Sequence, residues 1–231
     1  MAPTPTMLNA PALPLTHLLH RIPLFATLSE PQLAQLLKGA TKHRYRRDDR
    51  ILTRGVANRH LLVMLSGKAA ETTGATDRGV VLFRYLQPND HFGESSLIDG
   101  LPCSAHVQCL QTADVLAIEG RQFAQALVAS PPFAMALLHQ LSQRLRRANQ
   151  RIGDLALGSV SERTVRALAE VSAGVDGDHL LVGKVSPTEI ARMVGATRET
   201  VTRVMRDLQR SGHLVRAGTG GLLLRREGAA A

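Results

Sequence analysis

A charged stripe near the carboxyl end of the chain holds the residues best suited to chemical recognition. Its members recur at spacings of 1, 4, 5 and 8 residues, which places them on one face of a helix: Arg198, Glu199, Thr202, Arg203 and Arg206. An arginine can donate two hydrogen bonds to O6 and N7 of guanine, and a glutamate can accept one from N4 of cytosine. The stripe therefore predicts contacts to base edges of double-stranded DNA. The alternative is a solvated charged face on a pair of helices.

Two predicted helices joined by a tight turn position this stripe. Ser186, Pro187 and Glu189 form a capping box with proline at the first helical position, so the first helix begins there. Gly195 permits the sharp turn, and Thr197 can cap the second helix. Apolar residues at helical spacing are expected to face inward: Ile190, Met193, Val194, Val201, Val204 and Leu208.

In a helix-turn-helix, the amino-terminal part of the second helix enters the major groove. The candidate DNA-contacting residues lie at the starts of the two helices and along the stripe: Ser186, Thr188, Thr197, Arg198, Glu199, Thr202 and Arg203.

The composition indicates a protein of two modest domains with a polyanionic partner. The chain has 231 residues, 44% of them hydrophobic and 3% aromatic, and a formal net charge of +9. Its only cysteines, Cys103 and Cys109, exclude a disulfide framework and suit a reducing cytoplasm. No apolar run approaches 18 residues, and the amino terminus lacks the features of a signal peptide. We therefore expect a cytoplasmic protein with no membrane contact.

The pattern along the chain predicts an α+β fold with four segments. Residues 1–15 contain four prolines and are expected to form a disordered tail. Residues 16–129 combine short helices with many short apolar runs separated by turn signals, which is typical of an antiparallel barrel or jelly roll. Residues 130–157 are predicted to form one long helix. Residues 158–231 hold the helix-turn-helix, followed by a β-hairpin wing.

The long helix carries an apolar seam with gaps of 3, 4, 3, 4 and 3 residues. The seam consists of Leu138, Leu141, Leu145, Ala148, Ile152 and Leu155. A heptad repeat of this length predicts a two-stranded coiled coil and hence a homodimer. The alternative is a single face packed on its own domain.

Enzymatic motifs are absent from the sequence, since it contains no GxSxG, P-loop, HExxH or paired-carboxylate pattern. We therefore expect no catalytic residues, no metal ligands and no enzymatic activity. A rival of another class is a ligand-binding signalling module whose carboxyl-terminal domain contacts protein rather than DNA.

With these elements in order, the chain resembles the cyclic AMP receptor protein/FNR family of bacterial transcription regulators. Two segments carry the resemblance. Residues 195–203 look like the recognition helix of that family, and residues 92–105 look like its phosphate-binding cassette. The resemblance implies an effector-sensing β-roll, a dimerisation helix and a winged helix-turn-helix. It also implies a palindromic, TGTGA-like DNA site with half-sites about 34 Å apart, and RNA polymerase as a partner.

The same resemblance implies an effector pocket, but this chain lacks the arginine that would bind the phosphate there. Its lining would comprise Gly93, Glu94, Ser95, Cys103, Ser104, Arg144, Ala148 and Asn149. In cyclic-nucleotide binders an arginine that neutralises the phosphate stands where this chain has Cys103, while Glu94 matches the residue that holds the ribose hydroxyl. Ser104 can still donate to phosphate, whereas Ala148 and Asn149 replace residues that face the adenine. Loss of a charged hydrogen bond costs about 1.5–3 kcal/mol, or roughly tenfold to over a hundredfold in affinity.

Arg144 can compensate in part if it reaches the pocket. No cofactor is certain: cyclic AMP, cyclic di-GMP and effector-free DNA binding remain the alternatives. An FNR-type iron–sulfur cluster is disfavoured, because no cysteine precedes Cys103. A haem ligated by His91, His106 or His139, and a redox switch formed by the two cysteines, are further alternatives to ordinary histidines and inert buried thiols.

Overall fold

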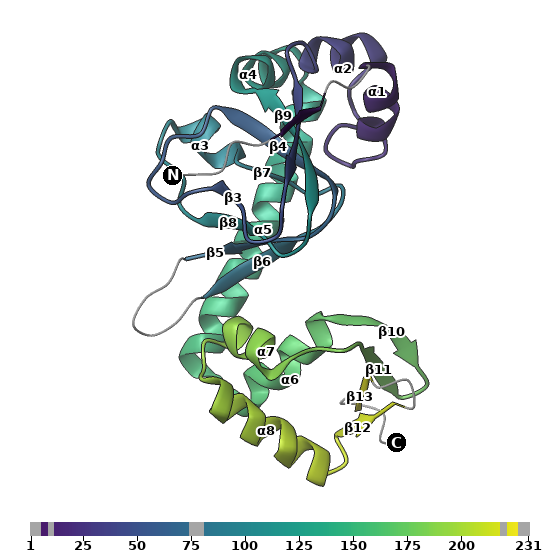
Figure 1. Ribbon diagram of the computed structural model, residues 1–231, viewed down its shortest axis with the longest axis vertical. Coiled ribbons are helices and arrows are strands. Elements are labelled where there is room, and N and C mark those ends of the chain that lie inside the picture. Colours follow the sequence, from purple (N-terminus) through teal and green to yellow (C-terminus); the bar gives the residue numbers. More distant parts are fainter. Residues whose placement is uncertain (1–5, 9–11, 74–80, 218–220, 226–231) are drawn as a thin grey trace. The chain divides into compact units, whose positions relative to one another are not determined.

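The computed structural model describes residues 6–8, 12–73, 81–217 and 221–225, apart from the side chains of residues 6–8, 12–14, 151 and 154–157 (Figure 1). The chain forms two compact units. The first comprises residues 1–74 and 82–145, and the second comprises residues 75–81 and 146–231. The division falls inside the long helix α5 (Pro131–Leu157), so each unit holds part of that helix.

Two antiparallel sheets form a β-roll in the first unit. The first sheet has the order β1-β2-β9-β4-β7, with β1 (Thr6–Leu8), β2 (Thr41–Tyr45), β9 (Ala113–Glu119), β4 (His60–Ser66) and β7 (His91–Phe92). The second has the order β3-β8-β5-β6, with β3 (Arg50–Leu52), β8 (His106–Cys109), β5 (Ala69–Thr72) and β6 (Leu82–Leu86). The jelly-roll-like architecture predicted from the spacing of the short apolar runs is confirmed.

Strand β4 is buried on both faces and separates two cores. Its alternate residues Leu61 and Val63 join a core formed with the helices, while Leu62 and Met64 join the core inside the roll. This division follows from the strand period of two, which sends successive side chains to opposite faces. The continuous apolar run in β4 is therefore the signature of a central strand covered on both sides.

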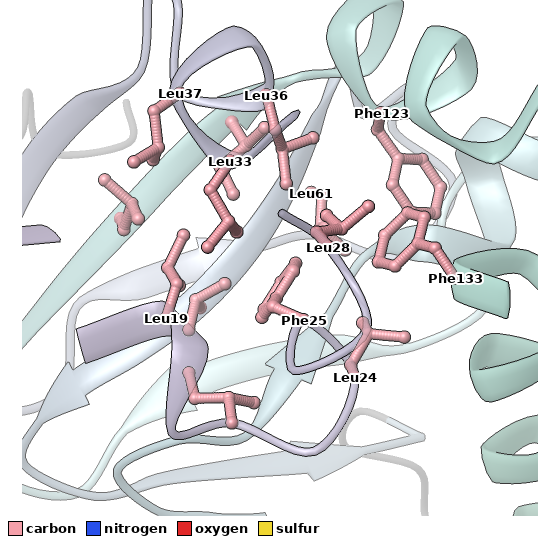
Figure 2. Packing of buried hydrophobic residues seen from close by; sticks show 14 of the residues in the cluster. Leu19, Leu24, Phe25, Leu28, Leu33, Leu36, Leu37, Leu61, Phe123 and Phe133 are labelled. Carbon is pink, nitrogen blue, oxygen red and sulfur yellow. The ribbon is translucent and has the colours of Figure 1, made fainter. Parts of the chain in front are cut away.

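Helices cover the outer face of this sheet: α1 (Ala12–His20), α2 (Glu30–Leu36) and α4 (Gly120–Ala129). Figure 2 shows their shared core, in which the rings of Phe25 and Phe133 stack with centroids 5.9 Å apart and Phe123 meets Phe133 edge to face at 6.0 Å. Phe133 and Leu137 are buried in this core, so the first turns of α5 are fixed to the roll. Leu141, one turn later, packs against the same core while remaining partly exposed.

The second unit packs three helices against a small antiparallel sheet. The helices are α6 (Val160–Glu170), α7 (Pro187–Val194) and α8 (Arg198–Arg210). The sheet has the order β10-β11-β13-β12, with β10 (Ser172–Asp176), β11 (His179–Val182), β13 (Leu222–Arg225) and β12 (Leu214–Arg216). Helix α6 starts at a capping box, in which Ser159 Oγ accepts a hydrogen bond from the Glu162 N–H at 3.2 Å.

The structure overrides local sequence signals in two places. The disordered tail over residues 1–15 is wrong where the chain is described, because residues 6–8 pair with β2 and α1 begins at Ala12; residues 1–5 and 9–11 lie outside the described chain. Gly174 and Gly177 are residue types that favour a loop, whereas β10 continues to Asp176 and pairs with β11. In each case pairing with a distant strand outweighs local proline or glycine signals.

Candidate nucleic-acid interface and ligand pocket

The helix pair α7–α8 begins and turns at the predicted residues. Ser186 Oγ accepts from the Glu189 N–H at 3.2 Å, and Glu189 Oε2 accepts in return from the Ser186 N–H at 3.1 Å. Thr197 Oγ1 accepts from the Thr200 N–H at 3.2 Å at the start of α8. Gly195 lies between them at φ 65°, in the left-handed region that favours glycine. These contacts fix where α8 starts and which face it presents.

The buried face of α8 differs in one residue from the prediction. Val201 is fully buried and Val204 and Leu208 are partly buried, as expected, but Met205 is more buried than either. Met205 follows Val201 by four residues, so the buried face is centred one residue further around the helix than the sequence indicated. In the sequence, only its helical spacing from Val201 indicates that Met205 is buried.

The charged stripe lies on the opposite face of α8. Arg198, Glu199, Arg203 and Arg206 are exposed, and none of their side chains forms a hydrogen bond or ion pair with another described residue. Thr202 is half-buried and donates to the Arg198 carbonyl at 2.7 Å. Thr188 is exposed on α7, while the hydroxyls of Ser186 and Thr197 serve as caps. The long charged side chains are therefore available to an external partner.

The predicted wing is present as the hairpin of β12 and β13, which pair antiparallel from Leu214 opposite Leu224 to Arg216 opposite Leu222. Residues 218–220, between these two strands, lie outside the described chain. Leu214 and Leu224 are buried in the core of the second unit and attach the hairpin to the helices.

A second candidate site lies inside the β-roll, where Glu94 begins α3 (Glu94–Asp99). Glu94 is 2% exposed, and its Oε1 pairs with Nη1 of Arg144 from α5. Arg144 Nη2 also lies 3.0 Å from His91 Nε2 and donates to the His91 carbonyl at 3.1 Å. Arg144 therefore contacts Glu94 and His91, and its role in an effector pocket stays a prediction. Glu94 Oε2 is buried without a hydrogen-bond partner among the described residues.

A further ion pair in the roll was not predicted from the sequence. Arg84 Nε donates to Glu71 Oε2 at 2.6 Å, and Arg84 Nη2 donates to the His91 carbonyl at 3.2 Å. Two guanidinium groups thus converge on the carbonyl oxygen of His91. The available sequence signal was an arginine two residues before Leu86, on the inward face of a strand.

His91 is held neutral by this environment. Burial, followed by the charges of Arg144 and Arg84, lowers the pKa of His91 to about 3. Burial also lowers the pKa of Arg144 from its ordinary value, with Glu94 opposing that effect. Because a neutral imidazole can accept a hydrogen bond, Nε2 of His91 is the acceptor for Arg144 and Nδ1 carries the proton.

The position corresponding to the missing cation is occupied by a buried thiol. Cys103 is buried, and its Sγ lies 3.8 Å from Ser96 Oγ. Ser95 and Ser104 are exposed, and Gly93 adopts φ 84° with Asn58 and His60 so close that a side chain would collide. Ala148 and Asn149 are exposed residues of the second unit, and their role as pocket residues stays a prediction.

The alternative sensors receive no support from the geometry. Cys103 precedes β8 rather than sharing a regular strand with Cys109, and burial raises the pKa of the Cys109 thiol to about 11. The three candidate haem ligands all have protein partners: His91 contacts Arg144, His106 accepts from the Arg54 N–H at 3.2 Å, and His139 lies 2.8 Å from Gln143. Within the described chain, no group of three or more His, Cys, Asp or Glu residues is placed to hold a metal ion.

The predicted seam of α5 is largely uncovered in the single chain. Leu138, Leu145 and Ile152, which are seven residues apart, are 57%, 62% and 63% exposed. Ala148 is also exposed, whereas Leu141 packs partly on its own core. The side chain of Leu155 lies outside the described residues.

Each half of the chain matches a known family of protein domains. Residues 42–130 match the family model of the cyclic nucleotide-binding domain, and residues 162–228 match that of the Crp-like helix-turn-helix domain, together about two thirds of the chain. The chain belongs to the CRP/FNR family. A relative within that family, the cAMP-activated global transcriptional regulator CRP of Pasteurella multocida, is 27% identical over 192 residues, which cover 81% of this chain and 91% of the relative.

Solved structures of CRP/FNR proteins have the same fold. A CRP/FNR transcriptional regulator from Thermus thermophilus superposes with a TM-score of 0.62 at 26% identity, covering 79% of this chain and 92% of the other. The c-di-GMP responsive global regulator CLP of Xanthomonas campestris gives a TM-score of 0.70 at 23% identity, covering 85% and 99%, a likeness of fold. The chain is therefore a CRP-like, DNA-binding transcription regulator, as its sequence predicted.

The relatives in this family are regulators of transcription rather than enzymes. Among the helices that the structure describes, none is both long enough and apolar enough to cross a bilayer.

Proposed function

We propose that this CRP/FNR regulator is a homodimer that reads a palindromic, TGTGA-like site, with one α8 helix per half-site. The observation that supports this most directly is the exposed row of Arg198, Glu199 and Arg203, whose side chains have no partner among the described residues. Arginine suits guanine and glutamate suits cytosine at the edges of the major groove. The capped start of α8 holds these side chains at the end of the helix that enters the groove.

The uncovered seam on α5 supports the proposed dimer. Burying a leucine or isoleucine side chain stabilises an assembly by about 1.5–3 kcal/mol, and Leu138, Leu145 and Ile152 are all more than half exposed in the single chain. Pairing of two α5 helices would cover them and would provide the twofold symmetry that a palindrome requires. RNA polymerase is the proposed protein partner of a dimer bound to such a site.

A small ligand in the β-roll is the proposed control. Glu94 Oε2 is a buried acceptor without a partner in the described chain, so it fits a hydroxyl donor of a ligand. The Pasteurella multocida relative is cAMP-activated, which makes cyclic AMP the first ligand to test. The opposing observation is Cys103, which leaves no cation at the usual phosphate position. Effector-independent binding is therefore the second candidate, and Arg144 would then hold α5 to the roll through Glu94 and His91.

The deciding experiment is a fluorescence-anisotropy titration of a palindromic TGTGA site, run with no ligand, with cyclic AMP and with cyclic di-GMP. The control DNA carries the same half-sites separated by about five additional base pairs, which turns them to opposite sides of the duplex. We expect tight, salt-sensitive binding to the palindrome and weak binding to the control. Equal, sequence-independent binding to both would contradict the proposal and favour a carboxyl-terminal domain that contacts protein. Tight binding that neither nucleotide changes would favour effector-independent regulation.

A further inference from the structure

The inner face of the β5–β6 hairpin carries a charged pair where an apolar residue would be usual. Leu86 and Ala69 face each other across these strands and are fully buried in the core of the roll. Arg84 and Glu71 also face each other, two residues further along the same two strands. Because side chains two residues apart lie on the same face of a strand, Arg84 and Glu71 point into the roll.

Arg84 retains hydrogen-bonding capacity in this position. A guanidinium has five N–H donors. Arg84 uses Nε for Glu71 and Nη2 for the His91 carbonyl, while its Nη1 has no hydrogen bond to a described residue. Its side chain is 27% exposed, so an entering molecule can reach it. Arg144 is more fully engaged, since both of its terminal nitrogens bind Glu94 or His91.

Two independent features indicate that the roll receives a ligand near Arg84. The first is the buried Glu94 Oε2, a carboxylate oxygen that lacks a donor among the described residues. The second is the convergence of Arg84 and Arg144 on the His91 carbonyl, which places a second cation beside the pair that holds Glu94. Position 103, by contrast, offers only a buried thiol to a phosphate.

We propose that Arg84 supplies the positive charge for the phosphate of a nucleotide ligand, in place of the cation missing at Cys103, while Glu94 accepts from a hydroxyl of the same ligand. This assignment rests on the proposed ligand control of the β-roll, and it adds a specificity-determining residue that acts from β6 rather than from the cassette. In this arrangement Glu71 competes with the phosphate for Arg84.

That competition gives the assignment a signature that a merely structural ion pair lacks. Removal of Arg84 and removal of the Glu71 charge should change nucleotide affinity in opposite directions. If the pair only stabilises the roll, both changes remove the same contact and should act in the same direction.

The test measures binding of cyclic AMP and of cyclic di-GMP to the full-length chain by isothermal titration calorimetry, with adenosine as a ligand that lacks phosphate. The variants are Arg84→Gln, Arg84→Lys and Glu71→Gln, each checked for folding by its thermal melt. For the nucleotide that binds the wild type, we expect Arg84→Gln to weaken affinity by about tenfold to a hundredfold, Arg84→Lys to retain most of it, and Glu71→Gln to strengthen it. Adenosine affinity should be little changed by any of them.

The outcomes distinguish the role of Arg84 from the proposed ligand control and from the proposed DNA recognition. Unchanged nucleotide affinity in Arg84→Gln, or equal losses in Arg84→Gln and Glu71→Gln, would overturn the role of Arg84 while leaving ligand control intact. If neither nucleotide binds the wild type at millimolar concentration, the assignment and the ligand control are both overturned. The proposal of palindromic DNA recognition is judged separately, by the anisotropy titration without ligand.

Discussion

Arg198 and Arg203 lie on the exposed face of α8 with no side-chain partner in the described chain, so their substitution tests recognition without disturbing the fold. We expect Arg198→Ala or Arg203→Ala to cost about 1–3 kcal/mol of binding to the palindrome and to relax specificity at one base pair. Competition titrations against sites with single base changes measure both effects. Arg210→Ala is the matched control, because it removes an exposed arginine from the other end of the same helix. A uniform loss across all sites would instead identify phosphate contacts.

His91 gives the chain a defined response to acid. Its pKa falls from an ordinary 6.5 to about 3 on folding, so below pH 6.5 the unfolded chain binds a proton that the folded chain does not. This contribution to stability is therefore fully present above pH 6.5 and is lost as pH falls toward 3, at up to about 1.4 kcal/mol per pH unit. The charged groups that face His91 are Arg144 from α5 and Arg84 from β6, with Glu94 and Glu71 as their partners.

The prediction is that His91→Gln, which keeps an acceptor for Arg144 but cannot titrate, loses less stability than the wild type between pH 6.5 and about pH 4. Urea denaturation at several pH values measures the difference. His139→Gln, which removes an exposed histidine of α5, should follow the wild type. Parallel curves for the wild type and His91→Gln would mean that His91 is protonated in the folded protein.

At the scale of elements, the start of α7 depends on one hydroxyl. Ser186 Oγ accepts from the Glu189 N–H, which also donates to the Ser186 carbonyl at 3.0 Å, so loss of the hydroxyl removes one of two acceptors for this donor. We expect Ser186→Ala to destabilise the second unit by about 1 kcal/mol. Ser186→Asn, which also caps helices well, should be close to the wild type. Chemical denaturation followed by circular dichroism compares the three proteins, and an equal loss in both variants would point to a role outside capping.

The elements also show which parts of the structure can be read from the sequence. Helix starts at Ser159, Ser186 and Thr197 were predictable because capping is local, within three residues of the chain. Strand β10 and the pairing of residues 6–8 were not, since each depends on a distant strand. For the proposed pocket, the sequence indicated the cassette, Ala148, Asn149 and Arg144, of which Arg144 contacts Glu94. The Arg84–Glu71 ion pair was not predictable, because these residues are brought together only by the register of β5 against β6.

At the scale of the whole molecule, the seam of α5 is expected to decide the oligomeric state. Leu145 is 62% exposed in the single chain, so Leu145→Glu should leave the fold intact while placing two carboxylates against each other in a dimer. We expect the dimer dissociation constant to rise by on the order of tenfold or more, about 1.4 kcal/mol. Analytical ultracentrifugation measures it, and affinity for the palindrome should fall in parallel.

Val128→Glu is the control for the seam, because it places the same charge on an apolar residue of α4 that is 86% exposed. It should remain a dimer. If Leu145→Glu left self-association unchanged, the α5 seam would not be the dimer contact. DNA would then be bound by a different arrangement of the chains.

The two buried thiols make it practical to follow dimer formation in solution with fluorescent labels. Both are free and buried, and Cys109 is further protected by a pKa of about 11, so thiol-reactive dyes should label the folded chain slowly. A cysteine placed at an exposed position such as Val128 should then be modified selectively, without prior removal of the native ones. Fluorophores attached in this way would report distances between protomers in a chain whose interior remains unaltered.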